Sequence, residues 1–352
     1  MRLLLVTNDY PPKTGGIQQY LGNLVAAYPD EVLVLAPADP SAHDEPGIVR
    51  SNSRFMWPTR GTARWVEAEA RAFAPDIVLF GAPHPLPLLG PRLRSRLGVP
   101  YGVLSHGAEV TLAAAIPGIR SAVRRGLREA DVLFAVSRYT AGNVSRLTGR
   151  DVAFVGAGVD IDVFRPGPGP GNAVPIVGCV SRFVPRKGQQ RLLRAVARLD
   201  QPVDVLLVGK GRTEHRLRAL ADRLGIPVRF AVDVDWGELP DLYRQMDVFC
   251  MPCRSRWFGL EAEGLGLVYL EAAASGLPVL AGDSGGSPET VRRGETGYVV
   301  HSVDDIVEGL EILQNDPERA RAMGVAGRRM VEAEFTWHRV VDRFREGFAA
   351  VV

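Results

Sequence analysis

The chain has 352 residues, a length that suits two domains of ordinary size. Its composition is 46% hydrophobic and 23% charged, as in soluble globular proteins, and no run approaches the roughly 18 apolar residues of a membrane span. The short apolar run at the start meets Asp9 and Pro11 too early for a signal peptide, and three cysteines do not form a secreted disulfide framework. A cytoplasmic protein is therefore expected.

The first half alternates apolar strand-like runs with helical patterns. The apolar runs cover residues 3–6, 32–35, 77–80, 101–104 and 132–136. Helical patterns lie between them, for example at 17–28 and 62–73. Continuous apolar runs joined by helices predict a parallel sheet covered on both faces.

A proline- and glycine-rich segment at 165–171 predicts a linker, and the strand–helix pattern restarts after it. The later apolar runs cover residues 176–180, 203–208, 228–230, 248–251 and 278–281. The expected fold class is α/β, with two doubly wound Rossmann-like domains at 1–168 and 169–335. Ligands of such sheets bind beyond the carboxyl ends of the strands, so a cleft between the domains is expected. From its pattern alone, the last helix at 336–352 could pack on either domain.

The most informative segment is 263–271. Gly264, Leu265 and Gly266 precede a helix-compatible run, and a glycine-rich loop at a helix start offers free amides to phosphate. Glu263 and Glu271 flank this loop, and eight residues of helix rise about 12 Å. One carboxylate can then reach a sugar and the other a ribose, with a diphosphate between them. The alternative is that Glu271 simply faces solvent.

A basic turn follows the first strand of the second half. It contains Arg182 and Lys187, and cations at a strand end can neutralise a leaving diphosphate. An ordinary basic surface turn is the alternative reading.

The loop after the first strand contains Asn8, Asp9 and Tyr10, followed by Gly15 and Gly16. Paired glycines at a helix start let the backbone approach a ligand closely. Neither this loop nor the segment 209–211 completes the GxGxxG pattern of a dinucleotide dehydrogenase.

His106 follows the run at 101–104, at the expected edge of the cleft. A structural loop histidine is the alternative, but no other histidine has a comparable position.

Metal motifs are weak in this chain. Asp160–Asp162 and Asp233–Asp235 match the Asp-x-Asp signature of metal-dependent sugar transferases, but capping aspartates give the same pattern. Cys250 and Cys253 are expected to be buried, inert thiols. The prediction is that no metal is obligatory, although Mg²⁺ is compatible with the site.

Positive charge is concentrated in residues 50–150, which hold fifteen arginines, no lysine and six acidic residues, although the whole chain is only +2. Arg120, Arg124 and Arg128 recur every four residues, with Arg125 beside them, and would share one helical face. We expect this face to meet an anionic membrane surface peripherally, with a plain solvated face as the alternative. The lack of interleaved aromatics disfavours nucleic acid.

Five features in chain order resemble family 4 GT-B retaining glycosyltransferases. They are the Glu-x7-Glu pair at 263 and 271, Ser181-Arg182 with Lys187-Gly188, Gly15-Gly16, Gly158-Val159-Asp160, and Phe164 with Pro166. In detail, Met251-Pro252-Cys253-Arg254 and the opening loop look like the actinobacterial phosphatidyl-myo-inositol mannosyltransferases, most nearly those that extend the monomannoside. Trp257-Phe258 stands in a loop where the phosphatidylinositol enzymes are expected to have small residues. This departure affects the assignment of the acceptor more than that of the fold or the reaction class.

The resemblance implies specific roles. Gly16 approaches the donor phosphate, Arg182 and Lys187 hold the diphosphate, and His106 lies at the reacting sugar. Glu263 and the backbone at 264–266 bind the sugar and phosphate, and Glu271 binds ribose. The base is expected near Val232 and Asp233, and the C-terminal helix packs back on the first domain.

The predicted function is transfer of mannose from GDP-mannose, with retention, to a phosphatidylinositol mannoside-type glycolipid at the cytoplasmic membrane face. One alternative is a family 4 enzyme that uses another UDP- or GDP-sugar on a soluble or secondary-metabolite acceptor. Another is a non-catalytic nucleotide-sugar binding protein. The oligomeric state is not predicted.

Overall fold

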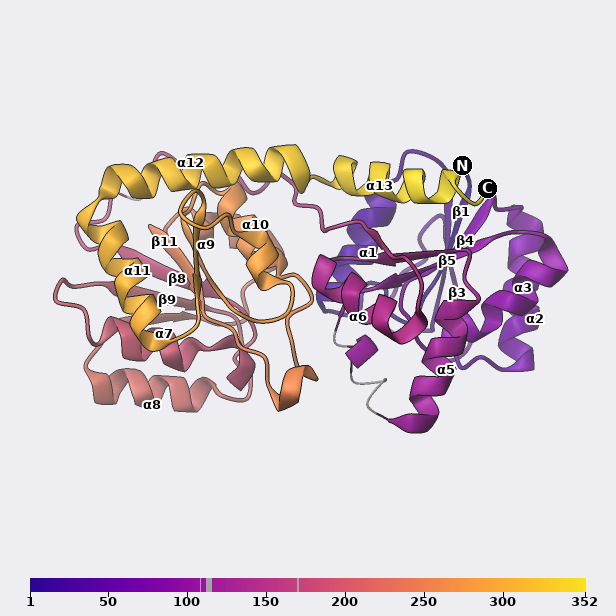
Figure 1. Ribbon diagram of the computed structural model, residues 1–352, viewed down its shortest axis with the longest axis horizontal. Helices are drawn as coiled ribbons and strands as arrows, with labels where there is room; N and C mark the ends of the chain where they lie inside the picture. The colour runs from indigo at the N-terminus through magenta and orange to yellow at the C-terminus, as the bar shows by residue number, and fades with distance from the viewer. Residues whose placement is uncertain (108, 112–115, 170) are drawn as a thin grey trace. The chain divides into compact units, whose positions relative to one another are not determined.

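The computed structural model describes residues 1–107, 109–111, 116–169 and 171–352. Contacts divide the chain into two compact units, one of Met1–Gly158 with Trp337–Val352 and one of Val159–Thr336. Each unit is a parallel sheet with helices packed against it (Figure 1). The predicted α/β fold with two parallel-sheet, Rossmann-like domains is confirmed.

The sheet of the first unit has the order β3-β2-β1-β4-β5-β6-β7, and every pairing is parallel. Its strands are β1 (Leu3–Val6), β2 (Val32–Ala36), β3 (Ile48–Arg50), β4 (Ile77–Phe80), β5 (Tyr101–Ser105), β6 (Val132–Ala135) and β7 (Ala153–Phe154). All four residues of β1 and of β4 are buried, because helices cover both faces of the sheet.

The helices of the first unit include the end of the chain. They are α1 (Gly16–Ala27), α2 (Arg60–Phe73), η1 (Leu86–Leu89), α3 (Gly90–Leu97), α5 (Pro117–Arg128), α6 (Arg138–Thr148) and α13 (Trp337–Ala349). Phe344 and Phe348 of α13 contact Phe134 of β6, with ring centroids 4.7 and 5.2 Å apart. The C-terminal helix therefore completes the core of the first unit, where it also packs on α1 (Figure 1).

The sheet of the second unit has the order β10-β9-β8-β11-β12-β13, again with parallel pairings. Its strands are β8 (Ile176–Val180), β9 (Asp204–Val208), β10 (Val228–Ala231), β11 (Val248–Met251), β12 (Val279–Gly282) and β13 (Gly297–Val300). Its helices are α7 (Gln189–Val196), α8 (Glu214–Leu224), α9 (Leu239–Tyr243), α10 (Leu267–Ala274), α11 (Val303–Asn315) and α12 (Pro317–Glu334), and its 3-10 turns are η2 (Pro185–Lys187), η3 (Trp236–Glu238), η4 (Trp257–Gly259) and η5 (Ser287–Thr290). Within the described chain, no helix is both long enough and apolar enough to cross a bilayer.

Residues 159–168 pack within the second unit, whereas the sequence assigns them to the first. The Arg328 guanidinium donates to the carbonyls of Ile161 and Phe164 at 2.9 and 2.7 Å, and the Phe164 ring meets Tyr243 edge-on. The contacts divide the chain at Gly158, before the proline- and glycine-rich segment rather than within it.

Candidate functional site

Two loops meet at the carboxyl edge of the second sheet. One follows β8 and the other follows β11. These strands are neighbours in the sheet, and the chain adds β9 and β10 on the β8 side and β12 and β13 on the β11 side. Such a switch point is where α/β sheets bind ligands. Gly188 lets the loops touch, because its φ is +79° and a Cβ would lie 2.1 Å from the carbonyl oxygen of Pro252.

Glu263 lies between two cations at this edge. Its Oε2 accepts a hydrogen bond from Lys187 Nζ at 2.9 Å and another from Arg186 Nη1. The three side chains are only 9–15% exposed. Burial alone would raise the pKa of Glu263, but Lys187 and Arg186 outweigh it and hold that pKa at about 2. The carboxylate is therefore charged, and Oε1 accepts no hydrogen bond from the described residues.

The backbone after Glu263 presents free donors. The Glu263 amide donates to Ser284 Oγ at 3.2 Å, and its carbonyl accepts the Gly286 amide at 2.9 Å. The amides of residues 264–266 donate to no group that the structure describes, and Gly266 caps α10 without a side-chain hydrogen bond. Free amides at a helix N-terminus beside two cations favour an anion such as a diphosphate.

Glu271 lies further along α10. Its Oε2 accepts a hydrogen bond from the Tyr243 hydroxyl at 2.8 Å. Burial raises the pKa of the Glu271 carboxyl to about 7, although the Tyr243 hydrogen bond works in the opposite direction. Glu271 is thus only partly exposed and bonded to Tyr243, rather than simply facing solvent. Near neutral pH this carboxyl can both donate to and accept from a pair of hydroxyls.

The remaining residues expected at the donor are exposed. Arg182 follows β8 and forms no ion pair with the described residues, so its charge is available to a ligand. Asp233 follows the edge strand β10, has φ +52°, and pairs with exposed Lys210 at 2.7 Å. Val232 beside it is 37% exposed. The structure thus brings Lys187, Glu263 and the 264–266 backbone together and leaves these three side chains at the surface.

In the first unit, His106 follows β5 and is buried. Its Nε2 donates to the carbonyl of Gly81, which follows β4, at 3.0 Å, and its ring meets Tyr20 edge-on with centroids 5.1 Å apart. Burial lowers the pKa of His106, against the opposing influence of Glu109. The imidazole is therefore neutral and held in one orientation at the carboxyl edge of the first sheet.

The loop after β1 is tied down by its own polar side chains. The Asn8 side chain exchanges two hydrogen bonds with the backbone of Met56, at 3.1 and 2.8 Å. Asp9 accepts from Gln18 Nε2 at 2.6 Å, and a Cβ on Gly15 would lie 2.2 Å from Gln18 Oε1. Tyr10 is buried, which raises its pKa to about 12. Gly16, the first residue of α1, has open space around it.

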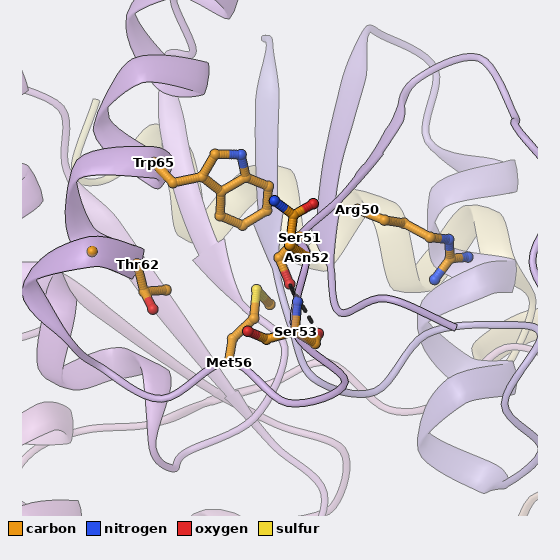
Figure 2. Close-up of a pocket in the computed structure, with 8 residues that line it drawn as sticks. Arg50, Ser51, Asn52, Ser53, Met56, Thr62 and Trp65 are labelled. Carbon is orange, nitrogen blue, oxygen red and sulfur yellow. Dashed lines mark hydrogen bonds between the residues drawn. The ribbon is translucent and has the colours of Figure 1, made fainter. Parts of the chain in front are cut away.

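A hollow of about 260 Å³ lies between the segment after β3 and the start of α2 (Figure 2). Trp65 and Met56 supply apolar surface, and Thr62 with residues 51–53 supplies polar groups. Arg50 points away from the other labelled side chains and donates to the carbonyl of Pro11 at 2.6 Å (Figure 2). Mixed apolar and polar lining is typical of small-molecule sites.

The four arginines expected on one helix lie on α5. Their side chains are exposed, and none forms an ion pair with a described residue; they are Arg120, Arg124, Arg125 and Arg128. Their charge is therefore not neutralised within the described chain.

The weak metal motifs have structural roles. Asp160 Oδ1 accepts the amides of Asp162 and Val163, and Asp235 caps η3. All three cysteines are buried and free, as was expected for Cys250 and Cys253. Among the described residues, no group of three His, Cys, Asp or Glu side chains is arranged to hold a metal ion.

Three residues that hold Glu263 and Glu271 in place were not predicted from the sequence: Arg186, Ser284 and Tyr243. Arg186 adjoins Lys187, but two neighbouring cations in a basic turn give no signal that both pair with the same carboxylate. Ser284 and Tyr243 are distant in sequence and carry no motif.

Two family models match the chain. "Glycosyltransferase Family 4" matches residues 14–163, and "Glycosyl transferases group 1" matches residues 160–330. The chain is 42% identical to a GDP-mannose-dependent alpha-(1-6)-phosphatidylinositol monomannoside mannosyltransferase of Mycolicibacterium smegmatis over 95% of both chains. It is 37% identical to a GDP-mannose-dependent monoacylated alpha-(1-6)-phosphatidylinositol monomannoside mannosyltransferase of Corynebacterium glutamicum, over 97% of this chain and 96% of that one.

Solved structures agree in fold. The sucrose-phosphate synthase of Thermosynechococcus elongatus is 22% identical over 99% of both chains, with a TM-score of 0.81. Anabaena HepE in complex with UDP is 19% identical, covering 99% of this chain and 100% of that one, with a TM-score of 0.82. The chain belongs to glycosyltransferase family 4, together with the phosphatidylinositol monomannoside mannosyltransferases that it resembles over nearly its whole length.

Proposed function

We propose that this chain is a retaining mannosyltransferase that transfers mannose from GDP-mannose to a phosphatidylinositol mannoside-type glycolipid. The observation that carries the proposal is the charged Glu263, held by Lys187 beside the free amides of residues 264–266. The names of the relatives at 37–42% identity supply the donor and the acceptor class.

The second unit binds the donor in this proposal. The diphosphate lies against the free amides and accepts from Lys187 and Arg182, the latter exposed and unpaired within the described chain. Glu263 Oε1 accepts from a sugar hydroxyl, and Glu271 holds the ribose. The base contacts the backbone near Val232 and Asp233, beyond the edge strand β10.

The reaction is a front-face substitution. The bond from the anomeric carbon to the β-phosphate oxygen breaks, and a bond to the acceptor oxygen forms on the same face. The acceptor hydroxyl gives its proton to the departing phosphate oxygen. Arg182, Lys187 and the amides stabilise the negative charge that develops on GDP, so no metal ion is obligatory.

In this proposal the first unit binds the acceptor and also contributes residues toward the donor. We assign Gly15 and Gly16 to the donor phosphate and His106 to the reacting sugar, where a neutral, oriented imidazole is suited to hydrogen bonding. Asn8 is hydrogen-bonded to the backbone of Met56, which lines the hollow of Figure 2, and we assign Asn8, Asp9 and Tyr10 to acceptor binding.

The acceptor is a lipid, so the enzyme has to reach a membrane. We propose that the arginine face of α5 docks on the anionic inner leaflet and that the protein is cytoplasmic and peripheral. The four uncompensated charges support this, since each basic residue near an anionic surface contributes about 1 kcal/mol.

Arg182→Ala and Lys187→Ala test the donor role. Each is expected to lower mannosyl transfer sharply, measured as glycolipid product from GDP-mannose. Near-normal turnover in either variant contradicts the role of that residue.

A further inference from the structure

Lys187 has two partners in the proposed function, the Glu263 carboxylate and the donor diphosphate. In the structure its Nζ donates to Glu263 Oε2, yet the proposed function requires the same ammonium at the donor diphosphate. The Glu263 carboxylate is only 12% exposed. If Lys187 were its only partner, the move of Lys187 to the diphosphate would leave a buried charge without a counter-ion, which is energetically costly.

Arg186 is the second cation on the same oxygen, and it is held independently of Lys187. Its Nη1 donates to Glu263 Oε2, and its Nε lies 3.9 Å from Glu261 Oε1. Its own carbonyl accepts the Arg254 amide at 2.9 Å, which fixes the turn against the loop after β11. Glu261 is held in turn by Arg256 at 3.4 Å.

We propose that Arg186 is a positioning residue that keeps Glu263 charged and oriented toward the sugar while Lys187 moves to the diphosphate. This inference rests on the proposed function. Arg186 contacts neither phosphate nor sugar in this scheme, and acts only through Glu263. The two adjacent cations therefore have different tasks, although the sequence presents them as one basic turn.

The proposal predicts a proton linkage. In Arg186→Met, Lys187 is the sole partner of Glu263, so donor binding strips the carboxylate of its last cation. Glu263 then takes up a proton when the donor binds. The free energy of protonating Glu263 at the working pH is subtracted from the binding free energy, so the donor binds more weakly. With Arg186 present, the carboxylate stays ionised and binds no proton.

Isothermal titration calorimetry with GDP-mannose, without acceptor and in two buffers of different ionisation enthalpy, measures this uptake directly. At pH 7.5, Arg186→Met is expected to weaken binding roughly tenfold to a hundredfold, the usual effect of losing a charge-assisted hydrogen bond. It should take up more protons than the unmodified protein, and the affinity deficit should shrink as the pH is lowered. Protonation at Glu271 is common to both proteins and cancels in the difference.

Three variants separate positioning from structure. Arg194→Met removes an exposed arginine from neighbouring α7 and should bind like the unmodified protein. Arg186→Lys keeps the charge and should restore most of the affinity. In Glu263→Gln, adding Arg186→Met should cause no extra proton uptake, because the titrating group is gone. Arg186→Gln carries the same test if the methionine variant does not fold.

The outcomes are distinguishable. If the unmodified protein binds GDP-mannose and Arg186→Met matches Arg194→Met in affinity and proton uptake, this inference is overturned and the proposed donor stands. Weaker binding without extra proton uptake also overturns it, since a merely structural role predicts that result. No binding by the unmodified protein overturns the proposed donor, and this inference with it.

Discussion

Glu271→Gln is expected to stabilise the ligand-free protein at pH 8. Burial raises the pKa of Glu271 from 4.5 to about 7, and one pKa unit corresponds to about 1.4 kcal/mol, so ionising this carboxyl in the fold costs about 3 kcal/mol. Glutamine keeps an acceptor for the Tyr243 hydroxyl, which lies 2.8 Å away, but never takes the charge. The variant should therefore avoid the cost entirely.

The pH dependence has a definite sign. Because the folded pKa is above the unfolded one, the cost is absent below about pH 4.5, grows as the pH rises, and is complete above about pH 7. The advantage of Glu271→Gln should thus be small at pH 5 and largest at pH 8. About 3 kcal/mol corresponds to a rise in Tm of roughly 6–12 °C for a unit of this size.

Thermal unfolding followed between pH 5 and pH 8 measures this advantage. Glu308→Gln, an exposed position on α11, is the matched control and should change Tm little at any pH. A Glu271→Gln variant no more stable than the unmodified protein at pH 8, or an advantage that does not change with pH, would contradict a cost of ionising Glu271. The same variant should raise the KM for the donor, because the carboxyl that destabilises the ligand-free fold is the group assigned to bind the ribose.

Three further predictions follow from the site. Lys187→Met should lower kcat/KM for mannosyl transfer by about 10²–10³-fold, the usual effect of losing one preorganised charge at a leaving group, and steady-state turnover near normal would contradict its role. Glu263→Gln should lower the free energy of unfolding by about 3 kcal/mol at pH 7, because the folded pKa of about 2 is below the unfolded value of 4.5; in urea titrations this deficit should shrink as the pH falls from about 4.5 toward 2, and a pH-independent deficit would argue against the pairing. Replacing Arg124 and Arg128 by glutamine should reduce flotation with anionic liposomes roughly tenfold or more at low salt, and unchanged flotation would exclude α5 as the docking face.

The sheets could be predicted because their strands are buried on both faces. Runs such as 3–6 and 77–80 are apolar without interruption, and they form β1 and β4 with no change of bounds. The short edge strands β3, β7 and β13 were missed, because each has residues that are only partly buried and so carries a weaker apolar signal.

The site could be predicted in part for a similar reason. Glu263, Lys187 and the glycine loop lie in local patterns whose chemistry is visible in the sequence. Which cations of the basic turn pair with a carboxylate cannot be read from the local sequence. The pairing depends on Glu263, which lies in the loop after a different strand, β11. The division at Gly158 also depends on distant contacts, those of Arg328 with residues 161 and 164.

The central claim is that this chain moves mannose from GDP-mannose to a phosphatidylinositol mannoside. Product analysis tests it most directly, with the purified protein, GDP-mannose and a panel of lipid and soluble acceptors, followed by mass spectrometry and determination of the anomeric configuration. The account predicts one added hexose on the phosphatidylinositol monomannoside, α-linked as in the donor. Consumption of GDP-mannose with only soluble acceptors, a β-linked product, or transfer from another nucleotide sugar alone would contradict it.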